Sequence, residues 1–244
     1  MLIKSQVKYI QSLSQKKCRD EEAVFIAEGP KLINELLNAP NLSLKQLFAT
    51  DDWIKSHQAS IPKDKLIEVS SSELERISSL TTPNQVLGVF TKPHFPHIDQ
   101  DHGITLMLDC LQDPGNLGSI IRCADWFGIK EVICSLDSAD VFNTKVVQAT
   151  MGSIARVHLI YAILSDYIRQ HKDLPVYAAT LNGTSLKSMK SVKKGILLIG
   201  NESKGIDPEL LKLASEQITI PRKGGAESLN AAVATGIILS HITQ

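Results

Sequence analysis

The sequence predicts an α/β protein that consists of two parts, each built from alternating strands and helices. Short apolar runs alternate with segments of helical periodicity along most of the 244 residues. The connections between consecutive apolar runs are too long for hairpins, which indicates parallel strands with helices between them. A polar stretch with two prolines interrupts the alternation, and we therefore expect a domain of residues 1–91, a linker of residues 92–103 and a domain of residues 104–244.

The first domain is expected to begin with a short basic helix and loop over residues 5–19. Pro30 occupies a favourable first position for the helix after the first strand. Asp51 or Asp52 is expected to cap a brief helix around Trp53, and SSELERISSL opens with a serine and a glutamate in a good capping arrangement. The expected strands are residues 23–29, 44–50, 65–70 and 86–91.

The second domain begins with an apolar run over residues 104–109, as expected of a strand that is buried on both faces. Gly128 is a good stop for the helix that follows. The remaining expected strands are residues 131–135, 157–161, 176–181, 195–200 and 217–221. The remaining expected helices are residues 143–155, 163–172, 209–215 and 229–243. This order predicts a parallel sheet with helices on both of its faces.

The composition is ordinary for a soluble globular protein, with 43% hydrophobic and 21% charged residues. No apolar run approaches the roughly 20 residues of a membrane span, and the amino terminus has no signal-peptide pattern. The four cysteines lack the spacing of metal ligands, so we expect reduced thiols in a cytoplasmic protein. The linker histidines have no Cys or carboxylate cluster beside them, and a metal site is not expected; they are His94, His97 and His102.

The formal net charge is zero, so no global field indicates a nucleic-acid partner. The distribution of charge is more informative, because no acidic residue precedes Asp20. The basic residues in that stretch are Lys4, Lys8, Lys16, Lys17 and Arg19. They form a local basic patch that suits RNA, although a solvated helix face explains them equally well.

Three segments at expected strand ends carry small or amide residues, namely 113–128, 197–206 and 228–240. Ligands of open α/β sheets bind beyond the carboxyl ends of the strands, so we expect one composite site there. The fingerprints of Rossmann dinucleotide sites, P-loops and α/β-hydrolases are absent. With these classes of site excluded, the three segments indicate a site that is built from amides, small residues and one arginine.

Within these segments, Asp113, Pro114 and Gly115 are expected to form a tight turn, and the Asn116 amide can orient a ligand. Arg122 offers a planar fork for phosphate or ribose oxygens, although a surface ion pair would also explain it. Gly200 allows close approach of a backbone to a ligand.

Other residues of these segments have structural explanations to different degrees. Asn201 and Glu202 could equally serve in capping or in an ion pair, and Ser228 could cap the last helix. Asn230 is harder to explain in this way, because asparagine is a mediocre helix former and the rest of that helix is small and apolar.

Together the segments resemble the signature motifs of the SpoU/TrmH family of RNA ribose 2'-O-methyltransferases, in the SPOUT superfamily. The matching stretches are DPGNLGSIIRCADWFGI, LLIGNESKGI and ITIPRKGGAESLNAAVATGI. FIAEGPKLINELL resembles part of the small RNA-binding domain, similar to certain ribosomal proteins, that precedes the catalytic domain in many members. The resemblance implies an α/β fold with a trefoil knot at the carboxyl end.

The resemblance also implies S-adenosylmethionine as the cofactor and ribosomal or transfer RNA as the substrate, with no metal. The matching cofactor positions are Gly200, Ile220 and Leu229, with Thr180, Asn201 and Ser228 nearby. Arg122 matches the catalytic arginine, and the positions that shape the ribose site are Asn116, Glu202, Ser228 and Asn230. Family members are homodimers through the knot region, so Arg122 serves its own site or that of the partner.

Two questions of chemistry stay open at this point. Arg122 could act as the base, or it could stay charged and stabilise the developing alkoxide, since a guanidinium group normally remains protonated. The chain could also be a non-catalytic RNA-binding or ribosome-assembly factor, or a SPOUT enzyme that methylates a base. The NLGSIIR and SLN motifs favour the ribose, and loss of the chemistry is opposed by the presence of Asn116, Arg122, Glu202, Ser228 and Asn230.

Overall fold

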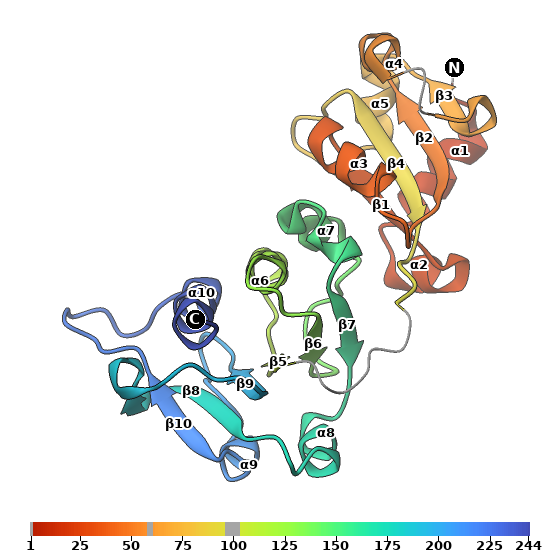
Figure 1. Cartoon of the computed structure of the whole chain (residues 1–244). Helices are drawn as coiled ribbons and strands as arrows, with labels where there is room; N and C mark the ends of the chain where they lie inside the picture. Colours follow the sequence, from red (N-terminus) through yellow and green to blue (C-terminus); the bar gives the residue numbers. More distant parts are fainter. Residues whose placement is uncertain (1, 58–60, 96–102) are drawn as a thin grey trace. The chain divides into compact units, whose positions relative to one another are not determined.

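The computed structural model describes residues 2–57, 61–95 and 103–244. The described chain forms two compact units (Figure 1). One unit contains residues 1–95 together with 142–155, and the other contains residues 96–141 together with 156–244. The segment 142–155 therefore belongs to the amino-terminal unit, although we had predicted it within the second domain. His97 and His102 lie outside the described residues, and the predicted domain boundaries stay a prediction.

The amino-terminal unit contains a four-stranded mixed sheet in the order β1-β4-β2-β3. Its strands are β1 (Val24–Glu28), β2 (Leu44–Ala49), β3 (Leu66–Glu68) and β4 (Val86–Thr91). β4 runs antiparallel to both β1 and β2, whereas β2 and β3 are parallel. All four expected strands are present, and the carboxyl ends of three of them meet at one edge of the sheet.

The helices before and around this sheet are α1 (Lys4–Ser12), α2 (Lys16–Glu22), α3 (Pro30–Leu37), α4 (Asp51–His57) and α5 (Ser71–Ile77). The basic start forms two helices rather than the one expected, with a break between them. Ser70 and Glu73 form a capping box at the start of α5, which confirms the glutamate in its first turn, although the capping serine is the residue that we had placed at the end of the preceding strand. A 3-10 turn, η1 (Lys63–Lys65), precedes β3.

Helix α7 (Thr144–Thr150) packs against β1 in the same unit. The ring of Phe142 lies 5.4 Å from the ring of Phe25, measured between centroids. The helix ends earlier than we expected, because Met151 and Gly152 adopt left-handed φ angles of 50° and 97°. A Cβ atom at residue 152 would lie 2.9 Å from the Glu35 Cβ atom on α3, so glycine is required there.

The carboxyl-terminal unit contains six parallel strands in the order β10-β8-β9-β5-β6-β7. The strands are β5 (Ile104–Leu108), β6 (Glu131–Cys134), β7 (His158–Tyr161), β8 (Val176–Ser185), β9 (Gly195–Ile199) and β10 (Glu216–Thr219). The predicted parallel α/β sheet is confirmed. After β7 at one edge, the chain crosses to β8 and then places β9 between β8 and β5. The trefoil knot is a property of chain threading that the strand order alone does not give.

Helices lie on both faces of this sheet (Figure 1): α6 (Pro114–Trp126) and α10 (Ala231–Ile242) on one, α8 (Leu164–Gln170) and α9 (Pro208–Leu211) on the other. α6 and α10 pack against each other. On the opposite face, Met107 and Leu198 of the sheet share a buried cluster with Leu164 and Leu210. A 3-10 turn, η3 (Leu186–Ser188), follows β8. No helix among the described residues is both long and apolar enough to cross a membrane.

Candidate active site

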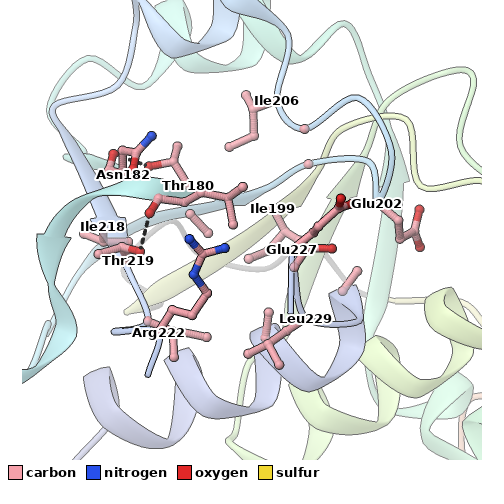
Figure 2. A pocket seen from close by; sticks show the side chains of 18 of the residues that line it. Thr180, Asn182, Ile199, Glu202, Ile206, Ile218, Thr219, Arg222, Glu227 and Leu229 are labelled. Carbon is pink, nitrogen blue, oxygen red and sulfur yellow. Dashed lines mark hydrogen bonds between the residues drawn. The ribbon is translucent and has the colours of Figure 1, made fainter. Parts of the chain in front are cut away.

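A cavity of about 710 Å³ lies between the strands β8, β9 and β10 and the start of α10 (Figure 2). Ile199, Ile206 and Ile218 contribute apolar side chains to its wall, and much of the rest is loop backbone. Every residue that we predicted for the cofactor lines this cavity, namely Thr180, Gly200, Asn201, Ile220, Ser228 and Leu229. The structure thus brings these six positions together from three distant segments.

Gly200 lies at the point where β9 ends and the backbone turns back on itself. A Cβ atom at this position would lie 2.4 Å from the carbonyl carbon of Gly205 and 2.5 Å from the amide nitrogen of Ile206. No real side chain fits at such distances, so the chain itself uses the space that we had expected a ligand to use. The requirement for glycine is therefore explained by the fold.

Asn201 holds this turn in place through both ends of its amide. Its Oδ1 accepts hydrogen bonds from the backbone amides of Ser203 at 2.8 Å and Lys204 at 3.1 Å. Its Nδ2 donates to the carbonyl oxygen of Cys110 at 2.7 Å, just beyond β5. Asn201 is thus a structural link between two strand ends, a role that differs from the capping or ion pair that the sequence left open.

Three of the predicted ribose-site residues form one hydrogen-bonded chain. The Asn116 Nδ2 donates to Glu202 Oε1 at 2.5 Å, and the Asn230 Nδ2 donates to Asn116 Oδ1 at 2.8 Å. These side chains come from α6, the turn after β9 and the start of α10, and we call them the amide–carboxylate network. Since Glu202 also lines the cavity, the network adjoins the predicted cofactor site.

The network depends on where two helices begin. The Asp113 side chain accepts a hydrogen bond from the backbone amide of Asn116 at 2.7 Å, and Pro114 occupies the first position of α6. The tight turn that we expected at 113–115 is therefore the first turn of this helix. Asn230 is the N-cap of α10, since its Oδ1 accepts from the amides of Ala232 at 3.0 Å and Val233 at 3.3 Å.

The structural role of Asn230 corrects our interpretation of the third segment. The sequence left Ser228 either as a site residue or as the cap of the last helix, and a structural reason for an asparagine at 230 was harder to find. In the structure Asn230 caps the helix and joins the network, so it has both a structural role and a place beside the cavity. Ser228 lies in the exposed segment 221–230 and lines the cavity instead.

Arg122 is the predicted site residue that neither lines the cavity nor joins the amide–carboxylate network. It is exposed, it is absent from the cavity lining, and it has no hydrogen bond or ion pair with any described residue. It follows Asn116 by six residues, which corresponds to a rotation of about 120° around the helix axis. Trp126, one turn later on the same face of α6, is 84% exposed.

Several polar residues that the sequence analysis did not select also line the cavity. They are Asn182, Thr219, Arg222, Lys223 and Glu227. Arg222 points into the cavity from the loop between β10 and α10 (Figure 2). The signal for Arg222, Lys223 and Glu227 was their position between an apolar strand and the SLN motif, whereas Asn182 and Thr219 lie within strands β8 and β10.

Two carboxylates just beyond the ends of the neighbouring strands β5 and β6 have shifted pKa values. Burial raises the pKa of Asp109, whose Oδ2 accepts a hydrogen bond from the Asp207 amide at 2.7 Å. A hydrogen bond from the Ser135 hydroxyl, 2.6 Å away, holds the pKa of Asp137 below its usual value. Among residues 2–57, 61–95 and 103–244, no group of three or more His, Cys, Asp or Glu side chains is arranged to hold a metal ion.

The cavity is suited to a nucleoside-type ligand such as S-adenosylmethionine. Its volume falls within the range of small-molecule sites, which is roughly 300–1,000 Å³. Ile199, Ile206, Ile218 and Leu229 can cover an adenine ring, and the backbone of three loops can read the polar edge of that ring. The adjoining network offers amide and carboxylate groups at the place where a second substrate would meet the cofactor.

Comparison with known proteins agrees with this geometry. Residues 103–240 match the SpoU rRNA Methylase family, and residues 4–88 match the MRM3-like substrate binding domain. The chain is 30% identical to a 23S rRNA (guanosine(2553)-2'-O)-methyltransferase from Bacillus subtilis, an alignment that covers 97% of this chain and 95% of the relative.

Two solved structures are also similar over nearly the whole chain. A TrmH-family protein from Porphyromonas gingivalis is 40% identical with a TM-score of 0.86, and the match covers 99% of this chain and 98% of that one. An AdoMet-bound rRNA methyltransferase from Sinorhizobium meliloti is 33% identical, also with a TM-score of 0.86, over 99% of this chain and 95% of that one. The chain therefore belongs to the SpoU rRNA methylase family and is an S-adenosylmethionine-dependent RNA 2'-O-ribose methyltransferase.

Proposed function

We propose that this protein methylates the 2'-hydroxyl of one ribosomal RNA ribose at the amide–carboxylate network, with S-adenosylmethionine in the adjoining cavity. The observation that carries the proposal is the hydrogen-bonded chain Glu202–Asn116–Asn230 beside that cavity. The family match and the B. subtilis relative, which acts on 23S rRNA, support ribosomal rather than transfer RNA. The absence of metal-ligand spacing supports a reaction without a metal, and the free cysteines support a cytoplasmic location.

The cofactor, when bound, supplies a methyl group on a cationic sulfur. The ribose oxygen has to approach this methyl group in line, so correct placement of the ribose contributes most of the rate enhancement. Asn116 orients the Glu202 carboxylate by donating to its Oε1, and Asn230 in turn holds Asn116 by donating to the Asn116 Oδ1. The other oxygen, which has no hydrogen-bond partner among the described residues, remains free to accept a bond from a ribose hydroxyl.

Arg122 is proposed to complete the site of a second copy of the chain. It lies away from the cavity of its own chain and is exposed. α6 and α10, which pack together, expose the apolar side chains of Trp126 (84%), Val233 (51%) and Ile237 (41%). An apolar face of this kind suits a homodimer interface near the carboxyl-terminal helix. There the guanidinium would stabilise negative charge on the attacking oxygen.

Substrate choice is proposed to lie in the amino-terminal unit. Residues 4–88 match a substrate binding domain, and Lys4 and Lys8 on α1 are exposed. Cations of this kind contact RNA phosphates, so we expect binding to weaken as salt is raised.

The reaction is tested by incubating the purified protein with tritiated S-adenosylmethionine and RNA from a strain that lacks the gene, followed by digestion to nucleosides. A labelled 2'-O-methylated nucleoside is expected, from ribosomal and not transfer RNA. A labelled base would contradict the ribose site that we propose. Cofactor binding without transfer to any RNA would favour the non-catalytic alternative or an assembly intermediate as the substrate.

The placement of Arg122 is tested by mixing two inactive variants, Arg122→Ala and Glu202→Ala. If each site takes Arg122 from the other copy, one site of every mixed dimer carries both changes and the other site carries neither. Random mixing should then restore about one quarter of the wild-type activity, because half of the dimers are mixed and each contains one intact site. Failure to recover activity in dimers shown to be mixed would place Arg122 in its own site.

A further inference from the structure

Arg222 is a charged side chain inside a cavity whose wall is mainly apolar. It lies three residues beyond the end of β10 and points into the cavity (Figure 2). Within the described part of the chain, its hydrogen bond is from Nη1 to the carbonyl oxygen of Ala226, 3.1 Å away in the same loop. A guanidinium group has five N–H donors, so most of its hydrogen-bonding capacity faces the cavity.

The loop that carries Arg222 is held at both ends. On one side, the Thr219 hydroxyl donates to the carbonyl oxygen of Leu181 at 3.1 Å, which ties the end of β10 to β8. On the other side, Asn230 caps α10. Between them, Gly224 and Gly225 have open space around them, and the whole segment 221–230 is exposed. The fold therefore fixes the direction of approach of Arg222 while leaving the loop tip free to adjust around a ligand.

We infer that Arg222 binds the carboxylate of the amino-acid portion of S-adenosylmethionine and so sets the affinity for the cofactor. The inference rests on the cofactor site proposed above. The apolar wall suits the adenine ring, but a carboxylate needs a cation with matching geometry. The arginine fork can pair with both oxygens of a carboxylate at once. The sulfonium is itself a cation and repels a guanidinium, so the carboxylate is the part of the cofactor that Arg222 should contact.

The contact can be isolated by comparing three ligands by calorimetry: S-adenosylmethionine, S-adenosylhomocysteine and decarboxylated S-adenosylmethionine. We expect Arg222→Gln to weaken binding of the first two by about 10-fold or more, as for loss of a charge-assisted hydrogen-bonded pair. Binding of the decarboxylated ligand should not change, because it lacks the group that Arg222 contacts. Arg222→Lys, which keeps the charge but loses the fork, should fall between wild type and Arg222→Gln.

Arg169→Gln is the matched control. Arg169 lies on α8, its side chain is 61% exposed, and it pairs with Asp166 at 3.3 Å. This variant makes the same change of charge outside the cavity lining, and all three affinities should match those of the wild type.

Three results would overturn the inference. Equal weakening of all three ligands by Arg222→Gln would mean that Arg222 only supports its loop. If Arg222→Gln gained affinity for S-adenosylmethionine relative to S-adenosylhomocysteine, the guanidinium of the wild type would be acting on the sulfonium. Unchanged affinities with lost methyl transfer would assign Arg222 to RNA. Absence of cofactor binding in the wild type would instead overturn the proposed cofactor site itself, so the two failures are distinguishable.

Discussion

Asn230 combines two functions that substitutions can separate. Its Oδ1 caps α10 by accepting two backbone amides, and its Nδ2 donates to Asn116 at 2.8 Å. Asn230→Ala removes both functions. Loss of an N-cap costs about 1 kcal/mol of folding free energy, and in a chain of this size each such loss lowers the Tm by about 2–4 °C. We therefore expect a small drop in stability together with a large drop in methyl transfer.

Asn230→Asp should preserve stability and still lose activity. Aspartate caps helices as well as asparagine does, and α10 has no acidic residue in its first turn that would repel it. A carboxylate cannot donate to Asn116, however, and it adds negative charge beside Glu202. We expect wild-type stability with methyl transfer reduced about tenfold or more, as for loss of a hydrogen bond that orients a charged group.

The assay combines denaturant melting, methyl transfer and hydrogen exchange at the amides of Ala232 and Val233. Exchange at these amides should rise in Asn230→Ala and stay low in Asn230→Asp. Asn143→Ala is the control, since Asn143 caps α7 through the Lys145 amide at 2.9 Å and should affect stability alone. The reasoning is refuted if Asn230→Asp is fully active, because Asn230 would then be only a helix cap.

Further predictions concern the turn after β9, the arginine and the cysteines. Gly200→Ala should lower stability by about 1–3 kcal/mol or more, since its Cβ would meet the Gly205 backbone at 2.4 Å, and chemical denaturation measures this loss. Arg122→Lys should retain measurable transfer with an unchanged pH–rate profile if the arginine stabilises charge; a new ionisation in the profile would instead indicate a base. Burial raises the pKa of Cys134 to about 12, so at pH 8 its thiol stays protonated and iodoacetamide should spare it. Mass spectrometry should find the more exposed Cys18 modified first.

The sequence predicted most strands and helices because their apolar periodicity and end signals agree. Ser70 with Glu73 and Pro30 gave correct helix starts, since capping is a local interaction between neighbouring residues. The end of α7 was wrong because Met151 adopts a left-handed φ of 50°, which nothing in its local sequence required. The predicted helix 209–215 shortened to α9 (Pro208–Leu211), where a tertiary fit again decided the boundary.

The cavity positions were predicted through the resemblance, whereas their structural reasons came from the fold. Gly200 is required by the backbone of a turn that returns over it, and Asn230 by a helix start that we had placed at Ser228. These contacts lie within a few residues of each other, but the apolar periodicity that placed the strands and helices does not encode them, and the bond from Asn230 to Asn116 joins distant segments. Arg222 was missed because only the path of its loop turns an exposed arginine toward the cavity.

The position of residues 142–155 affects how this architecture can be inherited. Helix α7 lies in the sequence between β6 and β7, yet it packs against β1 of the amino-terminal unit. Phe142, just before this helix, contacts Phe25 of β1. A fragment that ends at residue 95 would lack this cover and expose an apolar face of its sheet. Exchange of the amino-terminal unit between relatives would thus require three crossover events rather than one, because the chain passes between the two units three times. Recombination at a single point in the linker would pair the amino-terminal sheet of each product with the α7 of the other parent. We therefore expect the two parts of the gene to be inherited together.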